Sequence, residues 1–435
     1  MSYTKETPLS LKMLIEEEEK KEVQDKPIKK FKFNFGSQTN IGGQIDNQDD
    51  SYIFEDDFHQ IYGIGVLDGH CKMSGKLIAN TGCEFMKKHI KNNIELILEN
   101  PIEFISNCFK LIHEHIKLEL IKKYESKGFK IMIDQFGAIL KQYPGFTNWT
   151  IISGGTTKTM VLVVKDMMYI ANVGDSSALL CSSHPILKKE HINYLMDVSN
   201  PIIKKSNIDF KEDIPSFTLE LICDHSIDNE EEYKRIRSFA PSVDNPNKPK
   251  ALFVYDDNKQ PIKSNCNPIF DVSEDGVISK LTHNITFVKN VRKEPSAYIT
   301  SPLNATYLSS LAFTRTIGDY ILTEYGVTYQ PEIQSVNLKT VFECLENAKY
   351  KLNEQSPNIM SVIVASDGVW DNWIFNELSE FIMYEKFIER LINFPKKTAQ
   401  DISNLLIDRN NLYATHNFGE SADNATAILM YITQE

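Results

Sequence analysis

Aspartates recur at the ends of apolar, strand-like stretches of this sequence, where their carboxylates could bind metal ions. Four of them follow such a stretch and one precedes one: Asp68, Asp175, Asp224, Asp367 and Asp423. In an antiparallel sheet the end of one strand lies beside the start of its neighbour, so these acids can share one edge. Clustered carboxylates repel each other at pH 7, and divalent cations relieve that repulsion. The pattern favours a site for magnesium or manganese, which prefer oxygen ligands, although any single Asp-Gly pair is more often only a turn.

The elements that would position these acids are hairpin-linked strands and amphipathic helices. Apolar runs predict strands over 61–67, 160–164, 167–173, 219–223, 361–366 and 425–432. Lys165 and Asp166 predict a hairpin turn between two of these runs. Apolar residues at helical spacing predict helices within 77–90, 105–116, 378–382 and 402–406. This mixture predicts antiparallel sheets with helices packed outside them.

Short motifs that contain these acids carry a family resemblance. In chain order they are 47–49 (NQD), 66–70 (VLDGH), 153–157 (SGGTT), 171–176 (ANVGDS), 311–319 (LAFTRTIGD), 365–371 (ASDGVWD) and 421–424 (SADN). Together they resemble the metal-dependent serine/threonine protein phosphatases of type 2C. The resemblance implies an α+β fold, a four-layer α-β-β-α sandwich of two antiparallel sheets flanked by helices, with a binuclear metal site at one sheet edge.

The resemblance also implies the ligands of two Mg²⁺ or Mn²⁺ ions. Asp68 would bridge both ions, the Gly69 carbonyl would bind one, and Asp367 and Asp423 would bind the other. Asp49 would orient metal-bound water. One carboxylate can hold two ions about 3.5–4 Å apart, and a hydroxide bridging them would attack the phosphorus of phosphoserine or phosphothreonine.

Further residues match positions of the family near the metals. Asp175 and Asp371 match the ligands of a third, weaker ion in some relatives. His70 matches the general acid that protonates the leaving oxygen, an effect worth about 10²–10⁴-fold. The alternative is that His70 only binds a metal-bound water. Asp319 either completes the polar network nearby or belongs only to a turn.

Three residues depart from the family pattern without removing an implied ligand. Gln44 stands where many relatives carry an arginine that binds the substrate phosphate, and Gln48 stands where many carry a glutamate. A neutral amide can donate a hydrogen bond to phosphate but supplies no charge. Cys71 follows Asp-Gly-His where glycine is usual, so a positive φ there would cause strain.

The resemblance runs from about residue 31 to the end of the chain, which divides it into a tail and one domain. Residues 1–30 are charged, with few aromatic residues, and predict a tail outside the core. The phosphatase domain over 31–435 has expected insertions at about 182–216 and 240–307. The second insertion falls in the flap region beside the active site, where it would change which phosphoproteins dock.

Composition excludes several other classes of protein. A net charge of -12 and the lack of a basic groove disfavour nucleic-acid binding, including a metal-dependent nuclease. No long apolar run predicts a membrane span, and the scattered cysteines favour reduced thiols. We therefore expect a cytoplasmic or nuclear protein that acts on phosphoproteins; its oligomeric state is open, with a monomer expected.

The sequence thus favours an enzyme, a metal-dependent phosphatase of phosphoserine and phosphothreonine in proteins. The alternative is a catalytically weak relative that binds phosphoproteins or regulates a kinase. Gln44, Gln48 and Cys71 motivate that alternative, whereas Asp68, Asp367 and Asp423 argue against it.

Overall fold

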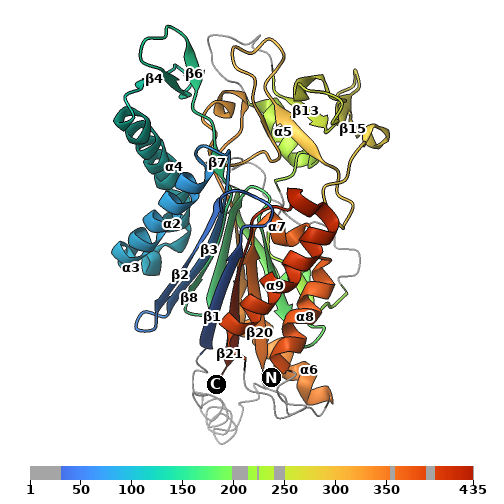
Figure 1. Cartoon of the computed structure of the whole chain (residues 1–435). Coiled ribbons are helices and arrows are strands. Elements are labelled where there is room, and N and C mark those ends of the chain that lie inside the picture. Colours follow the sequence, from blue (N-terminus) through green and yellow to red (C-terminus); the bar gives the residue numbers. More distant parts are fainter. Residues whose placement is uncertain are drawn as a thin grey trace, which may run out of the picture.

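The fold mixes α-helices with antiparallel β-sheets (Figure 1). The computed structural model describes residues 31–197, 214–222, 225–239, 250–352, 358–387 and 397–434. The tail expected at 1–30, Asp224 and parts of both expected insertions lie outside these residues. Among the described helices, none has the length and apolar character needed to cross a membrane.

The first sheet has five antiparallel strands in the order β1-β21-β20-β10-β12. Their bounds are β1 Phe31–Asn40, β10 Ser177–Ser182, β12 Thr218–Glu220, β20 Ile359–Ala365 and β21 Ala425–Gln434. Every residue of β20 is buried, as are the first eight of β21. A continuous apolar run of this length is what a strand covered on both faces requires.

The second sheet has eight antiparallel strands in the order β11-β19-β9-β8-β3-β7-β18, with β2 paired to β3. Their bounds are β2 Asp49–Asp56, β3 Ile61–His70, β7 Gly155–Thr156, β8 Lys158–Val164, β9 Met167–Val173, β11 Ile192–Asp197, β18 Ile317–Gly318 and β19 Glu332–Asn337. Strands β8 and β9 form the expected hairpin, with Lys165 at φ 57 in its turn.

Apolar side chains bury the facing surfaces of the two sheets. Ile64 and Val161 of the second sheet share one cluster with Val362 and Met430 of the first. On the outer face of the second sheet pack α2 Gly75–Asn92, α3 Ile94–Glu99 and α4 Pro101–Ser126. On the outer face of the first pack α7 Asp367–Trp370, α8 Phe375–Phe387 and α9 Ala399–Phe418 (Figure 1). The expected helices are therefore confirmed, and the sheets are antiparallel as predicted.

Smaller elements form a separate apolar cluster beyond one end of the sheets (Figure 1). Its elements are α5 Glu230–Ser238, β13 Leu252–Tyr255, β14 Phe270–Val272, β15 Ile278–Lys280, β16 Ala297–Thr300 and β17 Ser310–Leu311. The remaining named elements are β4 Lys130–Ile133, β5 Ile139–Gln142, β6 Trp149–Ile151, α6 Leu338–Leu352 and 3₁₀ turns at Lys189–His191, Lys263–Asn265, Thr282–Asn284, Leu322–Tyr325 and Gly419–Ser421. The described part of 240–307 thus contains regular strands, although its sequence shows little periodicity.

Two strand ends differ from the sequence prediction by three residues, and several others differ by one or two. Strand β3 does not stop before Asp68 but continues to His70, because Gly69 and His70 pair with β7. Strand β12 ends at Glu220, so the strand expected over 219–223 is shorter. The end of β3 is set by pairing with a distant strand, and an apolar pattern does not encode such pairing.

The close contact between the backbones at Gly368 and Asn424 allows a prediction about stability. A Cβ on Gly368 would lie 1.8 Å from the Asn424 carbonyl oxygen, whereas at Gly63 the nearest atom would be 3.5 Å away. We expect Gly368→Ala to lower the free energy of unfolding by about 1–3 kcal/mol, the usual cost of overpacking. Urea denaturation measures this. Gly63→Ala is the matched control, and an equal loss in both variants would contradict the packing.

Candidate active site

Asp49 and Asp68 lie opposite one another in the second sheet. They are cross-strand partners in the β2–β3 ladder. The backbone of Asp68 is fixed on its other side, since its N–H donates to Thr157 Oγ1 at 3.2 Å and its carbonyl accepts from Thr157 N at 2.9 Å. Thr157, between β7 and β8, therefore holds Asp68 in place.

The first sheet brings three more acids to the same end of the molecule. Asp367 comes two residues after the last residue of β20, and Asp423 comes two residues before β21. These strands are antiparallel neighbours with Ala365 opposite Ala427, so the two acids share one edge, as predicted. Asp175 precedes β10, whose Ser177 pairs with Ala365.

Hydrogen bonds tie the two sheets together at this end. Ser366 Oγ donates to Asp49 Oδ2 at 2.8 Å, and Gln48 N donates to Asn424 Oδ1 at 2.8 Å. Because each bond joins segments far apart in sequence, the relative position of the acids depends on the whole fold. We call the six carboxylates gathered here the acid end: Asp49, Asp68, Asp175, Asp367, Asp371 and Asp423.

Burial and mutual repulsion raise the pKa values of the carboxyl groups at the acid end. Burial, and then the charges of Asp49, Asp367, Asp423 and Asp175, raise the pKa of Asp68 well above its usual value. Burial is also the main cause that raises the pKa of Asp49 from 3.8 to about 7 and that of Asp175 from 3.8 to about 6. The pKa values of Asp367, Asp371 and Asp423 are raised as well, first by burial. The ionised cluster is therefore costly without a counter-charge.

Several carboxylate oxygens of the acid end fit a bound cation. Within the described residues, Oδ1 of Asp49, of Asp175 and of Asp367 are buried without a hydrogen-bond donor. A buried charged oxygen without a partner is costly, and hard divalent cations bind such oxygens. The donor set, all oxygen with no thiolate or imidazole among the acids, suits magnesium or manganese.

The carboxylates do not form a closed cage. In the part of the chain that the structure describes, no three His, Cys, Asp or Glu side chains gather closely enough to hold a metal ion by themselves. Magnesium does not require such a cage, because it keeps several waters and is usually held by one or two carboxylates. The acid end therefore suits ions that water partly coordinates.

His70 lies beside the acids and is paired with Asp319. The His70 Nε2–H group donates to Asp319 Oδ2 over 2.6 Å, and Thr316 Oγ1 donates to the same oxygen over 2.9 Å. Burial lowers the pKa of His70, but the Asp319 carboxylate outweighs burial, so the net shift is upward. Asp319 has φ 44 and its carbonyl accepts from Leu322 N at 2.8 Å, so the residue starts a turn as well as binding His70.

Asp371 lies at the same end, in a cavity of about 410 Å³ that Asp175 and Asp367 also line. Lys289, from the region of the second expected insertion, lines this cavity as well, and its Nζ lies 3.5 Å from Asp175 Oδ2. No sequence pattern pointed to Lys289, because it belongs to no motif. Ser366 was also missed. It lies within the quoted motif 365–371, and its place directly before Asp367 could have marked it as a residue of the site.

The remaining predicted residues surround the acid end. Gln44 is half-buried, with its amide donating to the Ala422 carbonyl over a long 3.5 Å. Gln48 Oε1 is buried without a donor. Gly69 lies in β3, where a Cβ would be 2.4 Å from the Gly75 carbonyl oxygen. Cys71 has φ 81, so the strain considered for a side chain at this position is present.

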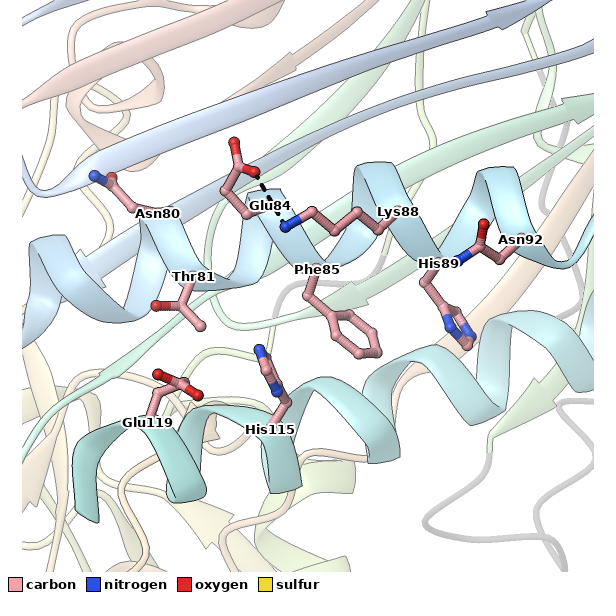
Figure 2. Close-up of a pocket in the computed structure, with 9 residues that line it drawn as sticks. All are labelled: Asn80, Thr81, Glu84, Phe85, Lys88, His89, Asn92, His115 and Glu119. Carbon is pink, nitrogen blue, oxygen red and sulfur yellow. Dashed lines mark ion pairs between the residues drawn. The ribbon is translucent and has the colours of Figure 1, made fainter. Parts of the chain in front are cut away.

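A second hollow of about 460 Å³ lies between α2 and α4, away from these residues. In Figure 2, Phe85 of α2 and His115 of α4 point toward one another across it, and Glu84 pairs with Lys88 along α2. No residue of the acid end lines it. The chemistry therefore belongs to the cavity beside Asp367.

Comparisons with known proteins agree with the resemblance. Residues 71–250 match the family model described as Protein phosphatase 2C, a stretch that includes Asp175 but not Asp68, Asp367 or Asp423. The fold is similar to a crystal structure of serine-threonine phosphatase 2C from Toxoplasma gondii, with 14% identity, TM-score 0.51 and coverage of 92% of this chain and 95% of that one. A serine/threonine phosphatase of S. agalactiae is matched at 14% identity and TM-score 0.43, over 92% of this chain and 99% of that chain. No curated protein matches the sequence.

The raised pKa values predict how the stability of the metal-free protein depends on pH. Asp49 and Asp175 bind protons more tightly in the folded than in the unfolded chain, so their contribution is full below about pH 4 and is lost as pH rises through about 6 and 7. We expect the Tm of EDTA-treated protein to fall by several degrees between about pH 5 and about pH 8, a range that brackets the pKa values of Asp49 and Asp175. Asp49→Asn should flatten the fall; a Tm that rises over this range would contradict the account.

Proposed function

We propose that this chain is a protein serine/threonine phosphatase of type 2C, whose family model matches residues 71–250, and that it hydrolyses phosphoserine and phosphothreonine with two Mg²⁺ or Mn²⁺ ions bound at the acid end. The observation that carries the proposal is that Oδ1 of Asp49 and Oδ1 of Asp367 are buried without a donor where the two sheets meet. We also take the fold to be the four-layer sandwich that the resemblance implies, because helices pack on the outer face of each sheet.

The proposed ligands follow from the motifs and their positions. Asp68 would contact both ions, the Gly69 carbonyl one of them, and Asp367 and Asp423 the other. Bound there, divalent cations would stabilise charge on the phosphoryl oxygens and lower the pKa of water. The neighbouring positions of β2 with β3, and of β20 with β21, support this assignment.

The residues around these ligands would position them and the attacking water. Ser366 Oγ donates to one oxygen of Asp49 and leaves the other oxygen without a donor. Asp49 can therefore accept a hydrogen bond from a water molecule beside Asp68. Gln44 would bring an amide but no charge toward a phosphate, which makes phosphate binding depend more on the ions.

His70 is proposed as the general acid. Its Nε2–H is held by Asp319, which fixes the ring and, against the effect of burial, raises the pKa of His70. The other ring nitrogen can then give a proton to the serine or threonine oxygen as it leaves. Without this proton the leaving group would be an alkoxide, which departs slowly.

The metal ligands make the first activity prediction. Asp68→Asn and Asp367→Asn each remove charge that holds the ions, so we expect phosphate release from a phosphothreonine peptide to fall on the order of 10³-fold or more in Mn²⁺, several kcal/mol of transition-state stabilisation. Asp408→Asn, on the exposed face of α9, is the control and should keep full activity. EDTA should stop turnover in all active forms.

Full activity in Asp68→Asn or in EDTA would exclude the proposal. Tight phosphopeptide binding by the wild-type protein without turnover at any Mn²⁺ concentration would favour the binding-protein alternative instead.

The general acid makes the second activity prediction. We expect His70→Asn to lower turnover of a phosphothreonine peptide by about 10²–10⁴-fold, but to lower turnover of p-nitrophenyl phosphate far less, because its leaving group needs no proton. His59→Asn, in the turn between β2 and β3, is the matched control. Equal losses on both substrates would show that His70 does not act as the acid.

A further inference from the structure

A hairpin from the second expected insertion reaches the acid end. Val288 and Pro295 form a bridge, Lys289 N donates to the Glu294 carbonyl at 2.7 Å, and Lys293 N donates to the Asn290 carbonyl at 3.0 Å. We call residues 288–295 the Lys289 hairpin. Backbone hydrogen bonds within the hairpin fix its conformation. The position of its side chains therefore depends on the surface against which the hairpin packs.

The Lys289 hairpin docks on the segment that carries Asp371. Val291 N donates to the Asp371 carbonyl at 3.1 Å, and the Asn290 side-chain amide donates to Asp371 Oδ1 at 3.1 Å. Arg292 donates to the Trp370 carbonyl and, at 3.2 Å, to the Trp373 carbonyl. These contacts join residues about eighty positions apart, so the hairpin is specifically anchored at this end.

This docking puts the Lys289 ammonium group among the acids. Its Nζ lies 3.5 Å from Asp175 Oδ2, and the Asp175 side chain is only 4% exposed. The positive charge lowers the pKa values of Asp175, Asp367 and Asp371 against the effect of burial. The Lys289 side chain is 22% exposed, and a partly buried pair of this kind is screened less by water and salt than a surface pair. Lys289 is therefore an internal counter-ion of the acid end.

The ammonium group and a metal ion cannot share this corner. A protonated amine has no lone pair to offer a metal, and its charge repels a divalent ion a few ångströms away. Because the lysine is part of the chain, it does not dissociate and is present at a high effective concentration. It would therefore compete with any ion that Asp175 and Asp371 could otherwise bind.

We propose that Lys289 is a tethered cation that takes the place of a divalent ion between Asp175 and Asp371, so that this chain binds one ion fewer than its carboxylates would allow. The inference rests on the proposed function, because it takes ions to bind at Asp68 independently of the place between Asp175 and Asp371. It assigns to the second expected insertion a role in the metal content of the site.

The test compares metal content and stability across variants of the full chain. Lys289→Met removes the charge, and Lys289→Gln removes it while keeping a group that can donate to Asp175. Isothermal titration with Mn²⁺, checked by elemental analysis after gel filtration, should give one more bound ion per chain in both variants than in wild type. In EDTA both variants should have a Tm lower by a few degrees, and saturating Mn²⁺ should recover this loss.

Controls separate this inference from the proposed function. Lys293→Met changes an exposed lysine of the same hairpin and should leave metal content and Tm as in wild type. Asp175→Asn combined with Lys289→Gln removes the proposed ligand and should abolish the extra ion. Equal metal content in wild type, Lys289→Gln and Lys289→Met would overturn the inference even if phosphatase activity is normal. A wild-type chain without bound Mn²⁺ or activity would overturn the proposed function, and the difference between wild type and Lys289→Gln would still decide the inference.

Discussion

Repulsion among buried carboxylates is the constraint on which the rest of this structure depends. Six aspartates lie at one end of two packed sheets, and burial raises their pKa values together with the charges of their neighbours. Near neutral pH, positive charge close to such a cluster lowers the cost of keeping its carboxylates ionised. We infer two sources of that charge, divalent ions at Asp68 and the Lys289 ammonium group beside Asp175.

The two sheets together hold the acids at this end. The pair Asp49 and Asp68 belongs to one sheet, and Asp367 and Asp423 lie at adjoining strand ends of the other. The Ser366–Asp49 hydrogen bond joins the sheets there, so the acids are held by the fold rather than by one loop. Through Lys289, the described part of the expected insertion at 240–307 also contacts these acids.

The sequence predicted the elements whose signal is local. The β8–β9 hairpin follows from two apolar runs around a polar turn, and the edge shared by Asp367 and Asp423 follows from antiparallel pairing. The end of β3 could not be predicted, because pairing with β7 from far along the chain extends it. The strands within 240–307 and the contact of Lys289 also depend on tertiary packing, and no local pattern encodes them. The assignment of metal ligands still rests on motifs and positions.

Crystals of the full chain grown with Mn²⁺ would test the central claim most directly, through anomalous diffraction from the metal. The account predicts two anomalous peaks flanking Asp68, one within reach of Asp367 and Asp423, and none between Asp175 and Asp371. No peak at Asp68 in crystals that contain bound manganese, or strong peaks only elsewhere on the chain, would contradict it.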